Sequence, residues 1–124
     1  MPLIASVSSL PPPYTLHQDI TTEFARELFS ESFHDIERLL NVFANGQIEE
    51  RQFSVPLQWF YEDHSFQERN DLYIDLATKY GAEVISRCLN NTIFLKEKIT
   101  EHSIDAIILV TSSGISTPSL EARI

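Results

Sequence analysis

The feature that most constrains this fold is an unbroken apolar run, Ala106–Val110, which leads directly into Thr111-Ser112-Ser113-Gly114. Five consecutive apolar residues are typical of a strand that is covered on both faces, as in a parallel sheet with helices on each side. The loops that follow such strands carry the functional groups of many α/β proteins. The run therefore predicts a buried core strand, and the residues after it are candidate site residues.

A second apolar run lies near the start of the chain, at Leu3–Val7, and Pro11-Pro12-Pro13 follows soon after it. Proline has no backbone N–H to donate to a sheet and restricts the chain to extended conformations here. We therefore predict a first core strand at Leu3–Val7 and a rigid loop after it. These two runs are the two predicted core strands.

The segment between the two runs has the periodicity of helices. Apolar residues at steps of three or four predict a helix over about His17–Ser30, with capping-box spacing at Thr15–Gln18. The same spacing predicts a second helix that begins near Phe33 and ends at Asn45-Gly46, a favourable left-handed stop. The periodicity then fades, and we interpret the aromatic residues between Gln47 and His64 as a loop packed on the core.

The strongest helical pattern starts at the capping box Ser65–Glu68 and continues to about Leu89. A short helix is expected over Ile93–Glu101, and Thr117 is expected to cap a last helix whose first residue is Pro118. The predicted fold class is therefore α/β, rich in helices, with one domain or part of one in the 124 residues.

Composition excludes some classes of function. Eighteen acidic residues against nine basic ones give a net charge of −9, which argues against a nucleic-acid partner because phosphate binding needs a concentrated basic surface. A single cysteine, Cys88, permits no intrachain disulfide and favours a reducing, cytoplasmic location. No apolar stretch is long enough to predict a membrane span.

The sequence also lacks the residue spacings that are typical of metal sites and of catalytic nucleophiles. Cys88 falls in the apolar stripe of the long predicted helix, which favours a core thiol. The four histidines are scattered without the spacing of zinc ligands, so no metal site is predicted: His17, His34, His64 and His102. The run Thr111-Ser112-Ser113 lacks the Gly-x-Ser-x-Gly elbow of a nucleophilic serine, which favours pocket lining or helix capping over catalysis. Arg51 fits a structural ion pair and a contact to an anionic ligand equally well.

Several segments in order resemble the N-terminal region of type III polyketide synthases, the chalcone and stilbene synthase family of the thiolase-like superfamily. Residues 3–12 resemble the opening strand and proline turn of that family, and Gln47–Arg51 resembles its "I-x-x-R" element. Phe66–Asn70 resembles the start of its long helix. Asp105–Pro118 resembles its "D-x-I-x-x-V-T-S-T-G-x-x-x-P" strand and loop, which is the most specific match. The resemblance implies a truncated part of a thiolase-like layered α/β fold.

The resemblance also implies roles for individual residues. The loop Thr111–Gly114 would form a gate between the coenzyme A tunnel and the reaction cavity, with Ser112 and Ser113 at the two hydroxyl positions that line the passage. Thr117 would reach toward the partner subunit of a homodimer. Of three basic positions that help to hold coenzyme A, only Arg38 keeps its charge, with Asn41 and Asn45 at the others. Arg51 is the second candidate for coenzyme A binding.

The chemistry implied by the resemblance is an acyl transfer that ends in decarboxylative Claisen condensation. A cysteine thiolate is acylated by an acyl-CoA starter, and malonyl-CoA then supplies the carbon nucleophile, with histidine and asparagine stabilising the developing charge. In the family these three residues lie beyond position 124, so we expect the present chain alone to be inactive. Coenzyme A thioesters would be substrates, and no resident cofactor is implied.

Two alternatives remain open at this point. An initiating ketoacyl-acyl carrier protein synthase shares the strand-to-loop pattern, although the helix-rich residues 17–61 favour the polyketide synthase branch. A non-catalytic interaction module that binds a full-length homologue is the other. A chain this short gains limited stability from its core, so we expect it to be marginally stable or to associate.

Overall fold

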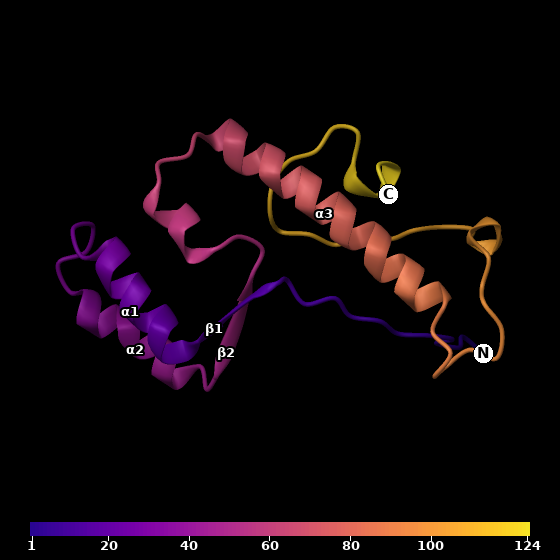
Figure 1. The fold of residues 1–124 in the computed structure, drawn as a ribbon, viewed down its shortest axis with the longest axis horizontal. Helices are drawn as coiled ribbons and strands as arrows, with labels where there is room; N and C mark the ends of the chain where they lie inside the picture. The colour runs from indigo at the N-terminus through magenta and orange to yellow at the C-terminus, as the bar shows by residue number, and fades with distance from the viewer. The chain divides into compact units, whose positions relative to one another are not determined.

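A computed structural model describes residues 1–124 and divides them into two compact units (Figure 1). One unit combines Met1–Leu10 with His64–Ile124, and the other is the continuous segment Pro11–Asp63. We refer to them as the outer unit and the inserted unit, after their order in the sequence. The chain is helix-rich with a two-stranded sheet, which is compatible with part of an α/β fold.

The inserted unit contains the sheet. Strand β1 (Tyr14–His17) pairs antiparallel with β2 (Glu50–Phe53), so that Tyr14 lies opposite Phe53 and His17 opposite Glu50. Between these strands the chain forms helix α1 (Gln18–Phe29) and helix α2 (Ile36–Asn45), which pack against each other. A short 3-10 helix, η1 (Leu57–Tyr61), follows β2. The two predicted helices are therefore confirmed to within a few residues.

Aromatic rings form the core of the inserted unit. Phe24, on the buried face of α1, is only 8% exposed and meets the rings of Phe60 and Tyr61 edge-on, with centroids 5.6 and 5.4 Å away. Phe60 in turn makes edge contacts with Phe53 and Trp59. Such perpendicular pairs place the positive edge of one ring against the negative face of the next. The expectation that this aromatic segment packs on the core is confirmed, although β2 and η1 give it regular structure.

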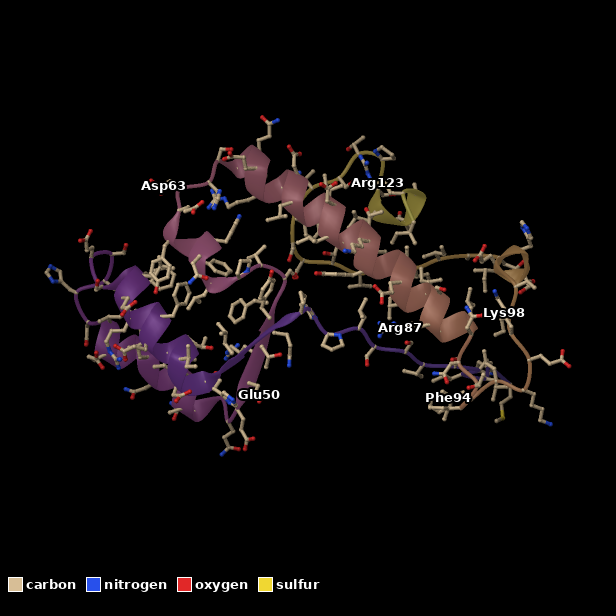
Figure 2. All side chains as sticks on the ribbon, viewed as in Figure 1. Glu50, Asp63, Arg87, Phe94, Lys98 and Arg123 are labelled. Carbon is tan, nitrogen blue, oxygen red and sulfur yellow. The ribbon has the colours of Figure 1, made fainter.

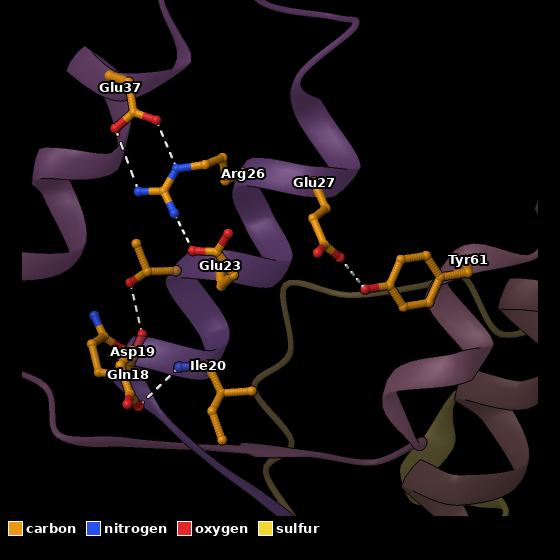
Figure 3. Close-up of polar contacts among 9 residues, drawn as sticks. Gln18, Asp19, Ile20, Glu23, Arg26, Glu27, Glu37 and Tyr61 are labelled. Carbon is orange, nitrogen blue, oxygen red and sulfur yellow. Dashed lines mark hydrogen bonds and ion pairs between the residues drawn. The ribbon is translucent and has the colours of Figure 1, made fainter.

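Polar contacts tie the helices of the inserted unit together. Arg26 of α1 bonds both Glu23, one turn earlier, and Glu37 of α2, and the Tyr61 hydroxyl donates to Glu27 at 2.8 Å (Figure 3). The hydrogen bond from Arg26 holds the pKa of Glu37 below its usual value. The hydrogen bond to Glu27 raises the pKa of Tyr61. All these groups are at the surface, where ion pairs add little stability but fix the pairing of α1 with α2.

The outer unit is built on helix α3 (Phe66–Leu89). Ser65 caps it as predicted: its hydroxyl accepts from the Glu68 N–H, and the Glu68 carboxylate accepts from the Ser65 N–H at 2.7 Å. The N-terminal segment runs to the far end of this helix, where the Ser6 hydroxyl donates to the Cys88 carbonyl at 2.8 Å and Asn91 donates to the Val7 carbonyl at 3.0 Å. Short 3-10 helices, η2 (Glu101–Ser103) and η3 (Leu120–Ala122), complete the unit, and η3 packs on α3 through the buried Leu120.

Neither predicted core strand is a strand in this structure. Residues 3–7 and 106–110 are extended but belong to no sheet, and Ile108 and Val110 are 90% and 91% exposed. The strands that do form, β1 and β2, pair with each other and offer no ladder to either run. An apolar run becomes a buried strand only when neighbouring strands satisfy its backbone groups, and no such neighbour lies beside either segment.

Several predicted helix ends were also wrong. Thr15 lies in β1, so the first helix starts after His17 without a side-chain cap. Gly46 has φ −72° and closes α2 in a right-handed conformation, while the left-handed residue is Gln47 at φ 50°. The short helix over Ile93–Glu101 is absent, and Ser119 rather than Thr117 precedes the last helical turn. At Thr15 the pairing of β1 with β2 places the residue in a strand, so a local capping pattern does not by itself decide where a helix starts.

Candidate functional site

The loop Thr111–Gly114 turns sharply in the outer unit. Gly114 has φ 55°, a left-handed conformation that glycine adopts at no steric cost. The Thr111 hydroxyl accepts from the Ser113 N–H at 3.3 Å, which closes a small turn over Ser112. The side chains of Ser112 and Ser113 make no hydrogen bond, so both hydroxyls are available to a ligand.

Two side chains of α3 hold this loop. The Tyr73 hydroxyl bonds the Thr111 hydroxyl at 2.6 Å, and the Tyr73 ring lies so close to Gly114 that a methyl group there would overlap it. One turn earlier, the Asn70 amide donates to the Ile115 carbonyl at 2.8 Å and accepts from the Ile115 N–H at 2.7 Å. Residues three apart on a helix share a face, so both side chains reach the same loop.

A cavity of about 340 Å³ opens beside the loop. Its wall combines the end of the apolar run with hydroxyl groups and one carboxylate, contributed by Tyr73, Leu109, Val110, Thr111, Gly114, Ser116, Ser119, Leu120 and Glu121. Ser112 and Ser113 are not in this wall. A second, more apolar cavity of about 510 Å³ lies between the last turns of α3 and Ile104–Ile107, and the half-buried Cys88 borders it.

The segment after the loop is held by Arg123, which projects beside η3 (Figure 2). Its guanidinium donates to the Ser116 hydroxyl at 2.9 Å and to the Thr117 carbonyl at 3.0 Å, while Ser116 donates to the Pro118 carbonyl at 2.6 Å. The Thr117 side chain is exposed and is left free by these backbone contacts. Arg123 therefore holds the backbone of this segment in place and leaves the Thr117 side chain without a hydrogen bond.

The cavity wall contains one carboxylate, that of Glu121, and its surroundings favour the charged form. A hydrogen bond from the Ser119 side chain, together with the backbone N–H of Glu121 itself, holds the pKa of Glu121 below its usual value of 4.5. A carboxylate that accepts hydrogen bonds is stabilised in its charged form. The cavity therefore carries a negative charge at neutral pH, which opposes the entry of a phosphate at that end.

The two predicted coenzyme A residues belong to the inserted unit. Arg38 lies exposed on α2. Arg51, on β2, donates to the Gln18 side chain at 3.1 Å and lies over the ring of Phe43, 5.4 Å from its centroid. Neither contact neutralises the charge of Arg51. In place of the ion pair considered for Arg51, the guanidinium donates to a neutral amide and makes a cation–π contact.

Sequence reasoning did not identify Asn70, Tyr73 or Arg123 as site residues. Tyr73 lies within the apolar pattern of the long predicted helix, but its ring lies against Gly114 and its hydroxyl bonds Thr111. Asn70 lies two residues after the capping box, in the segment Phe66–Asn70 that resembles the family's long helix, and nothing near it in the sequence indicates a partner 45 residues away. The residues that the structure describes contain no group able to hold a metal ion, and no helix long and apolar enough to cross a membrane.

Comparison with known proteins identifies relatives that span nearly the whole chain. A Bacillus subtilis (strain 168) protein, named provisionally as a chalcone synthase, is 43% identical over 124 residues, which are 100% of this chain and 34% of the relative. A 1,3,6,8-tetrahydroxynaphthalene synthase of Streptomyces peucetius subsp. caesius is 22% identical over 121 residues, 98% of this chain and 31% of that protein. The chain matches the N-terminal region of type III polyketide synthases.

The resemblance to type III polyketide synthases seen in the sequence is thus supported by proteins of both names. The chain spans about a third of the length of the curated relatives it matches. No protein-family model matches the chain, and no solved structure matches it.

Proposed function

We propose that residues 1–124 are the N-terminal part of an acyltransferase of the type III polyketide synthase kind. In the complete protein an acyl-CoA starter would acylate a cysteine, and malonyl-CoA would lose CO₂ to form the carbon nucleophile that attacks the acyl thioester. The catalytic residues are not among those of this chain, which alone should be inactive. The observation that carries the proposal is 43% identity along the entire chain to a relative named as a chalcone synthase.

The loop geometry supports a gating role for Thr111–Gly114. Tyr73 occupies the Thr111 hydroxyl, whereas the hydroxyls of Ser112 and Ser113 remain free. Small side chains with free hydroxyls can line a narrow passage and still hydrogen-bond a passing thioester carbonyl. We assign the gate to Ser112 and Ser113, with Thr111 and Gly114 as its anchors.

Coenzyme A binding and dimer contact complete the proposal. Arg38 is exposed and Arg51 keeps its full charge, so either guanidinium could bind a coenzyme A phosphate. The exposed side chain of Thr117 is free to contact a partner subunit of a homodimer. We further propose a thiolase-like layered fold and a cytoplasmic location for the complete protein. The names of the two relatives do not favour the carrier-protein synthase alternative.

The proposal can be tested with a chimera. Residues 1–124 would replace the matching segment of the Bacillus relative, which supplies the remaining two-thirds of the protein. We expect the chimera to release CO₂ from radiolabelled malonyl-CoA and to form labelled polyketide with acyl-CoA starters that the parent protein accepts. The 124-residue chain alone, assayed beside it, should form none.

The informative control is the unaltered parent protein under the same conditions. A chimera that folds and dimerises like the parent but condenses nothing would contradict the proposed function. A strict requirement for malonyl-acyl carrier protein, with no turnover of malonyl-CoA, would instead support the carrier-protein synthase reading.

A further inference from the structure

The strongest unassigned feature of the outer unit is a two-point clasp between α3 and the loop after the apolar run. The Asn70 amide meets both backbone groups of Ile115, at 2.8 and 2.7 Å, as a neighbouring strand would. An amide has one donor and one acceptor end, which match the C=O and N–H of a single residue. The Asn70 side chain therefore makes the two hydrogen bonds to Ile115 that a neighbouring strand would make.

The second point of the clasp is Tyr73. Its hydroxyl bonds Thr111 at 2.6 Å, and its ring occupies the space that a side chain at Gly114 would need. Glycine is thus required at position 114 both by its φ of 55° and by the Tyr73 ring. Tyr73 thus holds the loop at Thr111 and Asn70 holds it at Ile115, with Ser112 and Ser113 between these two points.

We propose that Asn70 and Tyr73 are positioning residues that set the conformation of the Thr111–Ile115 loop, and with it the width of the gate. This inference rests on the proposed function, because it names the residues that control the same passage. Asn70 fixes where the loop leaves toward Thr117, and Tyr73 fixes its entry from the apolar run. Neither residue touches the reacting atoms, so their effect on catalysis passes through Ser112 and Ser113.

The clasp itself is tested in the 124-residue chain by amide hydrogen exchange. The Ile115 N–H should exchange more slowly than the Ser112 N–H. The isosteric change Asn70→Asp keeps the acceptor and removes the donor, and Asn70→Ala removes both, so exchange at Ile115 should rise in that order, by at least about fivefold for alanine. The matched control Asp75→Asn, an exposed site on the same helix, should leave it unchanged. Equal exchange at Ile115 in all four proteins would overturn the clasp.

The effect on the gate is tested in the chimera. Tyr73→Phe and Asn70→Asp should change KM for long acyl-CoA starters, or the ratio of product lengths, by about tenfold while the thermal midpoint stays that of the unaltered chimera. Tyr73→Phe removes only the hydrogen bond to Thr111, whereas Thr111→Val also removes the contact with the Ser113 N–H, so the double variant should resemble Thr111→Val.

The outcomes separate the two proposals. An active chimera in which the Asn70 and Tyr73 variants keep the parent starter preference would overturn the positioning role and leave the proposed function standing. A folded but inactive unaltered chimera would overturn the proposed function and the gating role together, whereas the clasp would still stand or fall by exchange at Ile115.

Discussion

Replacing Phe24 by alanine should unfold the inserted unit selectively. Phe24 is 8% exposed and meets two further rings, so truncation removes a buried side chain and two edge contacts. Buried Phe→Ala changes cost about 3–5 kcal/mol. At roughly 0.05–0.15 kcal/mol per residue, a unit of this length is stabilised by only about 3–8 kcal/mol. The substitution therefore removes most of its stability, while Phe24→Leu, which keeps apolar volume, should cost about 1–2 kcal/mol.

The assay is urea denaturation followed by the fluorescence of Trp59, the single tryptophan, whose ring contacts Phe60 at 5.2 Å. Amide hydrogen exchange within α3 in the same samples reports the outer unit, because far-UV circular dichroism would also count α1 and α2. Ile20→Ala is the matched control, because Ile20 lies on the same helix at 46% exposure and should cost less than about 1 kcal/mol. A Phe24→Ala transition within about 1 kcal/mol of the parent would refute the aromatic core described above.

Three further outcomes are expected. Ser65→Ala should cost about 1 kcal/mol and speed amide exchange in the first turn of α3, whereas Ser65→Thr, which keeps the hydroxyl, should not. The pKa values of Glu37 and Glu68 lie below their usual 4.5 in the folded chain, so the stability that these carboxylates add is present above pH 4.5 and is lost as the pH falls through their folded pKa values. Acid titration followed by Trp59 fluorescence and circular dichroism should show this loss. The Glu68→Gln variant should abolish the pH dependence at α3. The chain exposes 9835 Å² of surface, whereas two separate compact units of the same total mass would expose about 8,100 Å². Because this excess surface favours contacts between chains, sedimentation should show association that grows with protein concentration. A monomer at all concentrations would contradict this expectation.

Helices were predictable because their causes lie within a few residues. The capping box at Ser65 and the apolar spacing up to Leu89 are local, and α3 has the bounds that they indicate. The same holds for the bodies of α1 and α2, whereas the start of α1 depends on where β1 ends.

Strands were not predictable in the same way, because a strand exists only with a partner. The run at Ala106–Val110 has the composition of a buried strand but lies unpaired, while the more polar Tyr14–His17 and Glu50–Phe53 pair although residues 18–49 separate them. The composition of a segment indicates whether it tends to be buried. Strand pairing also requires a second segment nearby in the correct register, which no local pattern specifies.

The candidate site could be predicted only in part, because some of its residues are distant from one another in the sequence. Small hydroxyl residues after an apolar run identify the loop Thr111–Gly114 directly. Its supports, Asn70 and Tyr73, lie about 40 residues earlier, and their roles follow only from the contact of α3 with the loop.

The interrupted order of the two units has a consequence for synthesis. The inserted unit is continuous, so all its contacts can form once Asp63 has been made. The first ten residues cannot join the outer unit until Cys88 and Asn91 exist, because their hydrogen bonds span 82 and 84 positions. At about 5–20 residues per second, that wait is on the order of 4–16 s. During it the Ser6 hydroxyl and the Val7 carbonyl have only water as a partner, so the N-terminal segment is fixed only after the inserted unit can already have folded.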